Sequence, residues 1–284
     1  MSAPTVALLG TGTMGLPMGR KIAAAGMPLR AWNRHRDKAE PLTSNGATVT
    51  DTAADAVAGA DLIITMLYDA DSVAAVIASA AESLGPAAIW LQMSTVGVAG
   101  ADRLAALADE LSLSYLDCPV LGTKKPAEDG ALTVLASGPE QHRAAAQPVF
   151  DAVGSRTIWV GAAGAGSRLK LVANSWILAL LEGMAESLKL ADGLGLDPGL
   201  FLQAVAGGAM DAPYLQLKAA SMLAGSFEPA FALSGAEKDA GLIIEAAQTA
   251  GVEMAVTEAA RRYLQAAIEA GHGDEDMSAI YLAH

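Results

Sequence analysis

The hydrophobic pattern divides the chain into two parts with different periodicities. Up to about residue 160, short apolar runs typical of buried parallel strands alternate with stretches whose apolar residues recur at helical spacing. We expect strands at 6–9, 29–32, 47–50, 61–67, 88–93, 113–116, 132–136 and 157–160. We expect helices at 13–25, 71–79 (capped by Asp71), 98–111 and 140–152, and a short helix opened by the capping box Thr52–Asp55. This alternation predicts a doubly wound α/β sheet.

The pattern changes at a glycine-rich stretch, residues 161–166, after which helical spacing prevails. Residues 167–192 read as one long helix that is apolar on more than one side, and shorter helices are expected at 198–205, 213–223, 237–250 and 254–270. The sequence therefore predicts two domains, a sheet domain at 1–162 and an all-α domain at 163–284, with a long interdomain helix between them.

The first strand opens into a glycine motif, Gly10-Thr11-Gly12-Thr13-Met14-Gly15. In a Rossmann-type domain the first glycine permits a tight turn, the second lets a pyrophosphate approach the backbone, and the third lets the helix pack on the strand. The alternative is an ordinary turn. Because a strand precedes the motif and a helix follows it, we expect Gly10, Gly12, Thr13, Met14 and Gly15 to bind a dinucleotide.

The second strand ends where the ribose contact of such a dinucleotide falls, at Asn33-Arg34-His35-Arg36. An acidic residue there favours NAD, and an arginine accommodates the 2′-phosphate of NADP. Since no acid occurs before Asp37, the sequence favours NADPH, held by Asn33, Arg34 and His35. The alternative is that these arginines are solvated loop charges.

Composition narrows the class of partner. The net charge of −13 argues against a nucleic-acid partner, and no continuous apolar run approaches the roughly 20 residues that span a membrane. A single cysteine excludes an internal disulfide and is typical of a cytoplasmic protein. We predict no metal site.

Two segments carry side chains suited to carbonyl chemistry. Lys170 and Asn174 lie four residues apart in the long helix, and hence on one face, which can line an interdomain cleft. An ammonium there supplies the proton and the positive charge that carbonyl reduction needs. After the strand near 116, the N–H groups of Gly122 and Thr123 are placed to bind a carboxylate. The alternatives are a solvated helix face and a surface loop.

The chain resembles the β-hydroxyacid dehydrogenases related to 3-hydroxyisobutyrate dehydrogenase, closest to the glyoxylate/succinic semialdehyde reductase branch. The motifs that carry this resemblance run nearly end to end: VALLGTGTMGLPMG, AWNR, LQMST, DCPVLGTKKPAEDGALTVLASG, GSRLKLVAN and FALSGAEKD. The resemblance implies an NADPH-dependent reductase of a small carbonyl compound, assembled as a homodimer or tetramer through its helices. It makes Lys170 the catalytic acid and Asn174 its partner. It places Met66, Leu67, Thr95 and Lys238 at the cofactor, and Ser94, Leu121, Phe231 and Asp239 at the substrate.

One position departs from the family. Leu121 stands where the family commonly has a serine that helps to bind the substrate carboxylate. A less polar or larger aldehyde or ketone is therefore expected, unless Thr123 compensates. Two other functions stay open, imine reduction on the same fold and a non-catalytic NADPH-binding scaffold.

Overall fold

The structure is a computed structural model that describes residues 3–284, and the chain forms two compact units. The first unit extends through Lys170 and the second begins at Leu171. Helix α7 (Ala165–Gly193) therefore belongs to the first unit through Lys170 and to the second unit from Leu171 onward. The division predicted at residue 162 lies just before this helix.

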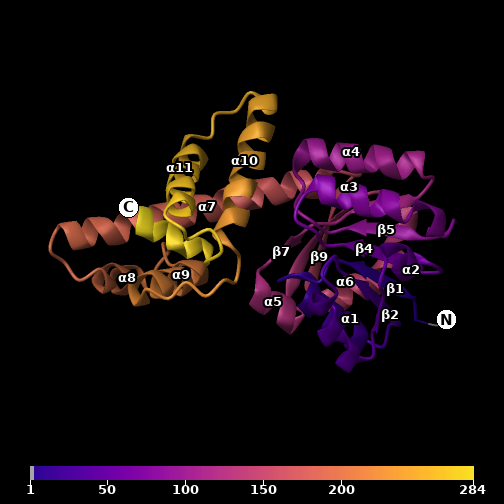
Figure 1. The fold of residues 1–284 in the computed structure, drawn as a ribbon. Coiled ribbons are helices and arrows are strands. Elements are labelled where there is room, and N and C mark those ends of the chain that lie inside the picture. Colours follow the sequence, from indigo (N-terminus) through magenta and orange to yellow (C-terminus); the bar gives the residue numbers. More distant parts are fainter. Residues whose placement is uncertain (1–2) are drawn as a thin grey trace. The chain divides into compact units, whose positions relative to one another are not determined.

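The first unit is built on one sheet, and Figure 1 labels several of its strands. Among the described residues the strands are β1 (Val6–Leu9), β2 (Leu29–Trp32), β3 (Thr48–Val49), β4 (Leu62–Thr65), β5 (Ile89–Gln92), β6 (Ser114–Asp117), β7 (Val120–Leu121), β8 (Leu132–Ser137) and β9 (Gly154–Gly161). Six of them lie in the parallel order β3-β2-β1-β4-β5-β6; β8 then runs antiparallel to β6 and β7, and β9 runs parallel to β8. This order confirms the predicted doubly wound sheet, with its topological switch between β1 and β4.

Helices cover both faces of this sheet because alternate strand residues point to opposite sides. Val6 and Leu8 of β1 pack in one core with helices α1 (Gly15–Ala24), α5 (Lys124–Asp129) and α6 (Arg143–Val153). Ala7 and Leu9 pack in a second core with α2 (Ala53–Val57), α3 (Ala70–Ser79) and α4 (Gly97–Glu110). The strand is buried on both faces, as its unbroken apolar run predicts.

Some local predictions were wrong. Helix α3 is capped by Asp69, which accepts a hydrogen bond from the Ser72 N–H at 2.8 Å, and Asp71 lies inside the helix. Thr52 does cap α2, as predicted, by accepting from the Asp55 N–H at 3.0 Å. The segment after β6, for which a surface loop was the alternative to a carboxylate-binding turn, contains strand β7 and helix α5, and neither element was predicted.

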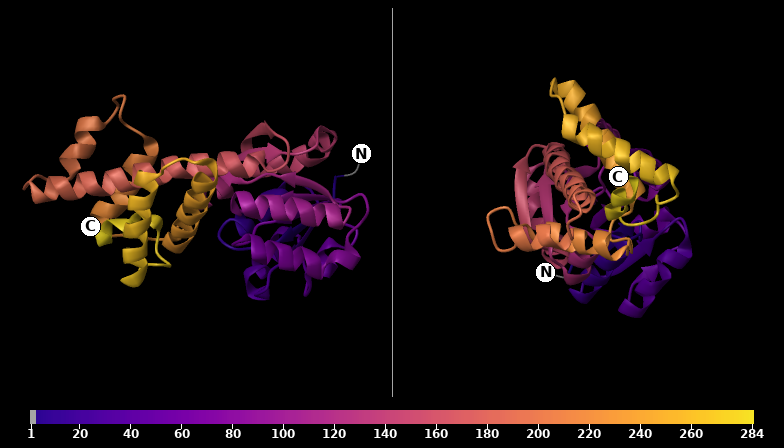
Figure 2. Two further views of the ribbon diagram at one scale, coloured as in Figure 1. Left: turned by 90° about the horizontal axis from the view of Figure 1, so that it is seen from above. Right: turned by 90° about the vertical axis from the view of Figure 1, so that its left-hand side faces the viewer.

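The second unit is helical, and Figure 2 follows α7 as one uninterrupted helix. It contains α8 (Gly199–Val205), α9 (Pro213–Ala224), α10 (Leu233–Ala250), α11 (Ala255–Glu269) and the 3-10 segment η5 (Met277–Ala283). Apolar residues of α7, α10, α11 and η5 form the buried interior, among them Leu181, Leu188, Ala240, Leu264 and Ile280. The predicted all-α domain is confirmed, with a single isolated bridge between Ala232 and Asp276 outside the strands of the described residues.

A buried ion pair joins two parts of this unit. Lys218 of α9 donates to Asp276 at 2.6 Å, and both side chains are almost fully buried. Asp276 also accepts hydrogen bonds from the N–H groups of Ala230 and Ser278. Although burial raises the pKa of Asp276, the bonds from Lys218 and Ser278 bring that pKa below its ordinary value.

By length and composition, α7 is the one helix of the described residues that could cross a membrane, and 44% of its most apolar window is buried. One such helix is weak evidence, because the core helix of a globular domain has the same composition.

Candidate active site

The glycine motif lies at the carboxyl end of β1, at the topological switch. Gly10 has a φ of +106°, and a Cβ there would come within 2.2 Å of the Met66 carbonyl oxygen. A Cβ on Gly15 would come within 2.0 Å of the Gly10 carbonyl oxygen, so both positions exclude any side chain. Gly12 has no neighbour within 4 Å of such a Cβ, which leaves the room that a pyrophosphate needs.

The turn also leaves donors available at the start of α1. The N–H groups of Gly12, Thr13 and Met14 donate no hydrogen bond to any of residues 3–284, and the first bond of the helix runs from the Leu16 N–H to Gly12. Unpaired N–H groups at a helix N-terminus bind anions, so this loop fits the phosphates of a dinucleotide.

The structure distinguishes the two arginines that follow β2. Arg36 is held by Glu40 and Asp51, and the bond to Glu40 has a length of 2.7 Å. Arg34 is exposed and forms no ion pair with any of residues 3–284. Asn33 bonds to the His35 carbonyl at 3.2 Å and so stabilises the turn that carries Arg34. Of the two guanidinium groups, the one on Arg34 remains for a phosphate.

The other predicted cofactor residues of this unit follow the next two strands. Met66 and Leu67 come directly after β4, and Thr95 follows β5. Ser94 is fully buried: its hydroxyl accepts from the Leu67 N–H at 2.9 Å and bonds to the Thr65 carbonyl at 3.2 Å. Ser94 therefore joins the ends of two strands, a role that the sequence analysis missed, and its contact with substrate stays a prediction.

The segment after β6 carries the predicted carboxylate-binding residues. Leu121 ends β7 and is partly exposed. Gly122 has a φ of +121°, and a Cβ there would meet the Leu132 side chain at 2.7 Å. Thr123 precedes α5, but its hydroxyl forms no capping bond, so it is available to a ligand. Lys125 is paired with Asp129 of the same helix.

Cys118, in the same segment, is fully buried, and its thiol lies 3.5 Å from the Leu116 carbonyl oxygen. Burial, with a smaller contribution from the neighbouring Asp117, raises the pKa of this thiol.

Lys170 ends the first unit and is 8% exposed. Its Nζ donates to the Val120 carbonyl at 2.8 Å, so the ammonium lies beside the β7 segment that carries Leu121.

The remaining predicted residues form a group within the second unit. Asn174 of α7 donates to the Asp239 carboxylate of α10 at 2.8 Å, and both residues are buried. Lys238 lies 3.2 Å from the other oxygen of Asp239. Phe231 lies just before α10, where its ring is in contact range of Gly235. Asp239 thus orients Asn174, and its contact with substrate stays a prediction.

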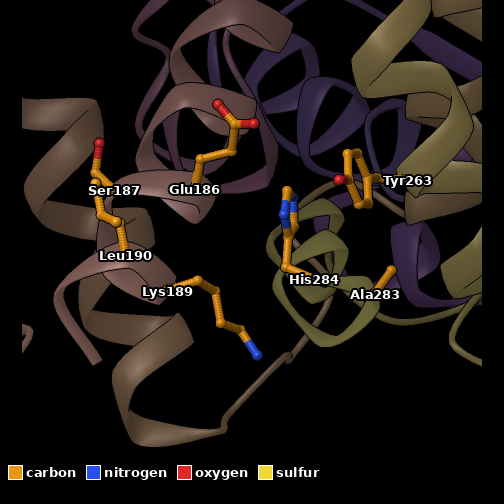
Figure 3. Close-up of a pocket in the computed structure, with 7 residues that line it drawn as sticks. All are labelled: Glu186, Ser187, Lys189, Leu190, Tyr263, Ala283 and His284. Atoms are coloured by element: carbon orange, nitrogen blue, oxygen red, sulfur yellow. The ribbon is translucent and has the colours of Figure 1, made fainter. Parts of the chain in front are cut away.

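A hollow of about 600 Å³ lies elsewhere in the second unit, and no predicted site residue lines it (Figure 3). Its wall includes Glu186, Lys189, Tyr263 and His284, whose imidazole stacks on Tyr263 with 3.8 Å between ring centroids. The nearby Glu182 is buried, and burial with the charge of Glu186 raises its pKa to about 7. Among residues 3–284, no group of three His, Cys, Asp or Glu side chains is placed to hold a metal ion.

The first unit is a nicotinamide-dinucleotide-binding domain, as its glycine turn, the open N-terminus of α1 and its strand order indicate. A helical domain follows it. Comparison with known proteins supports this class. Residues 5–161 match the family described as the NAD binding domain of 6-phosphogluconate dehydrogenase. Residues 164–283 match the family described as NAD-binding of NADP-dependent 3-hydroxyisobutyrate dehydrogenase.

Individual relatives are similar to this chain over nearly its whole length. Glyoxylate/succinic semialdehyde reductase 2 of Arabidopsis thaliana is 32% identical over 97% of this chain and 78% of its own. The 3-sulfolactaldehyde reductase of Escherichia coli is 32% identical over 97% of this chain and 94% of its own. The structure of Mycobacterium tuberculosis 3-hydroxyisobutyrate dehydrogenase with L-serine has a TM-score of 0.89 at 28% identity and covers 99% of both chains.

The chain belongs to the β-hydroxyacid dehydrogenase family, the relatives of 3-hydroxyisobutyrate dehydrogenase. It is an oxidoreductase that uses a nicotinamide cofactor and acts on hydroxyl or carbonyl groups. The predicted family and class of activity are confirmed.

Proposed function

We propose that this protein reduces a small aldehyde or ketone with NADPH and that Lys170 is the general acid. The observation that carries this proposal is the buried ammonium of Lys170, which donates to Val120 beside the end of the sheet where the cofactor residues lie. Bound NADPH supplies the hydride that reaches the carbonyl carbon. As the C=O electron pair moves to oxygen, the ammonium stabilises the growing negative charge and transfers its proton to that oxygen.

Arg34 supports the choice of NADPH over NADH. Its guanidinium is exposed at the end of β2, while Arg36 is neutralised by two carboxylates. We infer that Arg34 binds the 2′-phosphate, with Asn33 and His35 shaping the turn around it.

Leu121 and Thr123 indicate the class of substrate. The apolar Leu121 offers no hydrogen bond to a carboxylate, but the free hydroxyl of Thr123 and the N–H groups of this turn do. We infer a substrate with an apolar group beside Leu121 and at most one acidic group. Glyoxylate has no apolar group to place there and should be a poor substrate.

We also propose a homo-oligomer formed through α7. Val172, Trp176 and Leu190 share one face of α7, and Leu194 directly follows the last residue of the helix at the same spacing; each of the four is more than 60% exposed. Gly183 is equidistant in sequence from Val172 and Leu194, and also from Trp176 and Leu190. Two copies of this face packed antiparallel across a two-fold axis therefore match apolar residue to apolar residue, as an isologous interface requires.

Trp176→Glu tests this interface, with Leu217→Glu as the control because Leu217 is an equally exposed leucine of α9. We expect the first change, and not the second, to lower the molar mass measured by light scattering. The single, buried cysteine fits a cytoplasmic location.

The catalytic proposal is tested by NADPH oxidation over aldehydes, ketones, 2-oxo acids and cyclic imines. Lys170→Ala should lower kcat by about 10²- to 10⁴-fold. Lys170→Arg keeps the charge but does not release a proton, so it should be similarly impaired. Lys189→Ala removes a lysine from the same helix and should be neutral.

Three results would change this conclusion. An unchanged kcat in Lys170→Ala excludes the acid role. Higher activity on imines than on every carbonyl compound makes the enzyme an imine reductase. Tight NADPH binding without oxidation of any substrate makes it a scaffold.

A further inference from the structure

Asp117, the last residue of β6, is fully buried and faces the start of α7. One carboxylate oxygen accepts the Ser167 N–H at 2.7 Å, and the other accepts the Ser167 hydroxyl at 2.7 Å. An aspartate that accepts from the first N–H groups of a helix satisfies orphan donors and complements the positive end of the helix dipole. Here the aspartate comes from a strand 50 residues away in sequence rather than from the residue before the helix.

A second strand residue completes this anchor. The Ser137 hydroxyl, on β8, accepts the Gly166 N–H at 2.9 Å and donates to the Asp117 carbonyl at 2.9 Å. A Cβ on Gly166 would lie 2.3 Å from the Leu135 carbonyl oxygen and 2.8 Å from that of Asp117. The backbone of the first turn of α7 therefore packs directly against the backbone of β6 and β8.

Lys170 lies one helical turn beyond this anchor. Its Nζ bonds to Val120, which follows Asp117 closely in the chain, so one short segment holds both the beginning of the helix and the ammonium. If α7 shifted along its axis or rotated about it, the Lys170 Nζ would move away from the Val120 carbonyl and its hydrogen bond would be lost.

We propose that Asp117, acting through Ser167, is a positioning residue that sets the place of the Lys170 ammonium. The expected effect on catalysis rests on the proposed function, in which Lys170 is the general acid. The expected effect on the position of the ammonium does not, because that position can be measured without turnover.

Stability alone does not explain an aspartate at this position. Burial raises the pKa of Asp117, in opposition to the bonds from Ser167 and Ser137 and the charge of Arg168. A raised pKa means that the charged form costs free energy in the fold. A group that costs stability and orients a buried ammonium is expected at a functional site.

The test compares Asp117→Ala with Asp117→Asn. Alanine removes both acceptors, and we expect kcat to fall by roughly 10- to 100-fold, with KM for NADPH unchanged, because small misplacements of a reacting group are that costly. Asparagine retains one acceptor for the Ser167 N–H, and the Ser167 hydroxyl can reverse to accept from its amide. We expect Asp117→Asn to recover most of the lost kcat.

Ser167→Ala provides a milder variant should Asp117→Ala fail to fold. It removes the hydroxyl bond and keeps the N–H bond, so kcat should fall by a few-fold, about 2- to 10-fold, as for one lost hydrogen bond. Thr52→Ala is the matched control, because it removes a helix cap of the same kind from α2 and touches none of these residues. It should lower thermal stability and leave kcat intact.

A second measurement separates this inference from the proposed function. Acylation of Lys170 by a small reagent, followed by mass spectrometry with the exposed Lys124 as internal reference, reports how firmly the amine is held. Labelling of Lys170 should rise in Asp117→Ala and return towards the wild-type rate in Asp117→Asn. If Asp117→Ala and Ser167→Ala leave both labelling and kcat at wild-type values, the inference is wrong, even where Lys170→Ala abolishes activity. If labelling rises but Lys170→Ala retains full kcat, the positioning role stands and the acid role fails.

Discussion

Replacing Arg34 by alanine should weaken the binding of NADPH and leave the binding of NADH unchanged. Arg34 is exposed just beyond β2 and forms no ion pair with any of residues 3–284, so its charge is available to a ligand. Arg36, two residues later, is paired with Glu40 and Asp51, and these bonds raise its pKa against the opposing effect of desolvation. Arg36→Ala is therefore the matched control.

The magnitude follows from the kind of bond that is lost. A hydrogen bond to a charged group contributes about 1.5–3 kcal/mol, which corresponds to roughly 10- to 150-fold in Kd. Because Arg34 is exposed, solvent and salt screen the interaction, and we expect the lower half of this range at about 0.15 M salt. NADH lacks the 2′-phosphate, so its Kd should not change.

The assay is a calorimetric or fluorescence titration of wild type, Arg34→Ala and Arg36→Ala with both cofactors, at low and at high salt. The difference between wild type and Arg34→Ala should shrink as salt is added. Equal losses for NADPH and NADH in Arg34→Ala, or a larger loss of NADPH affinity in Arg36→Ala, would refute the assignment of the phosphate to Arg34.

Three further changes have expected outcomes. Because the pKa of Glu182 is raised to about 7, its carboxyl still holds a proton in the folded protein at pH values where the unfolded chain has lost it, and stability should fall as pH rises from about 4.5 to 7. Glu182→Gln should remove this loss: in urea unfolding the variant should be more stable than wild type by about 1–3 kcal/mol at pH 8, but not at pH 5. Lys218→Met leaves the Asp276 carboxylate buried without its cation and should lower the free energy of unfolding by about 3–5 kcal/mol, with a part recovered in a double variant that also carries Asp276→Leu. Leu121→Ser adds one donor beside the substrate and should raise kcat/KM for glyoxylate by about 2- to 10-fold, with no gain for an apolar aldehyde.

The strands and the cofactor edge could be predicted because their signals are local. Val6–Leu9 is an unbroken apolar run, and the glycines after it need no distant partner to define a tight turn. Parallel strands then bring their carboxyl ends to one edge, and Met66, which the family resemblance assigns to the cofactor, comes directly after β4 at that edge.

Other features depend on partners far away in the sequence. The ion pair with Asp51 helps to make Arg36 unavailable to a phosphate, and no rule of sequence spacing links these two residues. Asp117 meets Ser167 only once β6 and α7 are in place. The cap of α3 could not be assigned from the sequence for a more local reason. Asp69 and Asp71 are both suitable N-cap residues, and only the backbone conformation, which is extended at Asp69, shows that the helix begins after Asp69.

The β7–α5 segment was missed because its sequence carries conflicting signals. Prolines at 119 and 126 indicate a loop, whereas the pairing of Lys125 with Asp129 one turn later supports a short helix. Helix α5 is too short to show helical periodicity, so its packing in the core through Ala127 decides the outcome.

The buried thiol of Cys118 can report unfolding of this protein without an added label. It is the one sulfhydryl of the chain, it is inaccessible and protonated in the native state, and it adjoins the residue on which α7 rests. An alkylating reagent can therefore reach it only when the sheet opens, and the rate of alkylation counts those openings. A chain without other thiols needs no engineered label for that experiment.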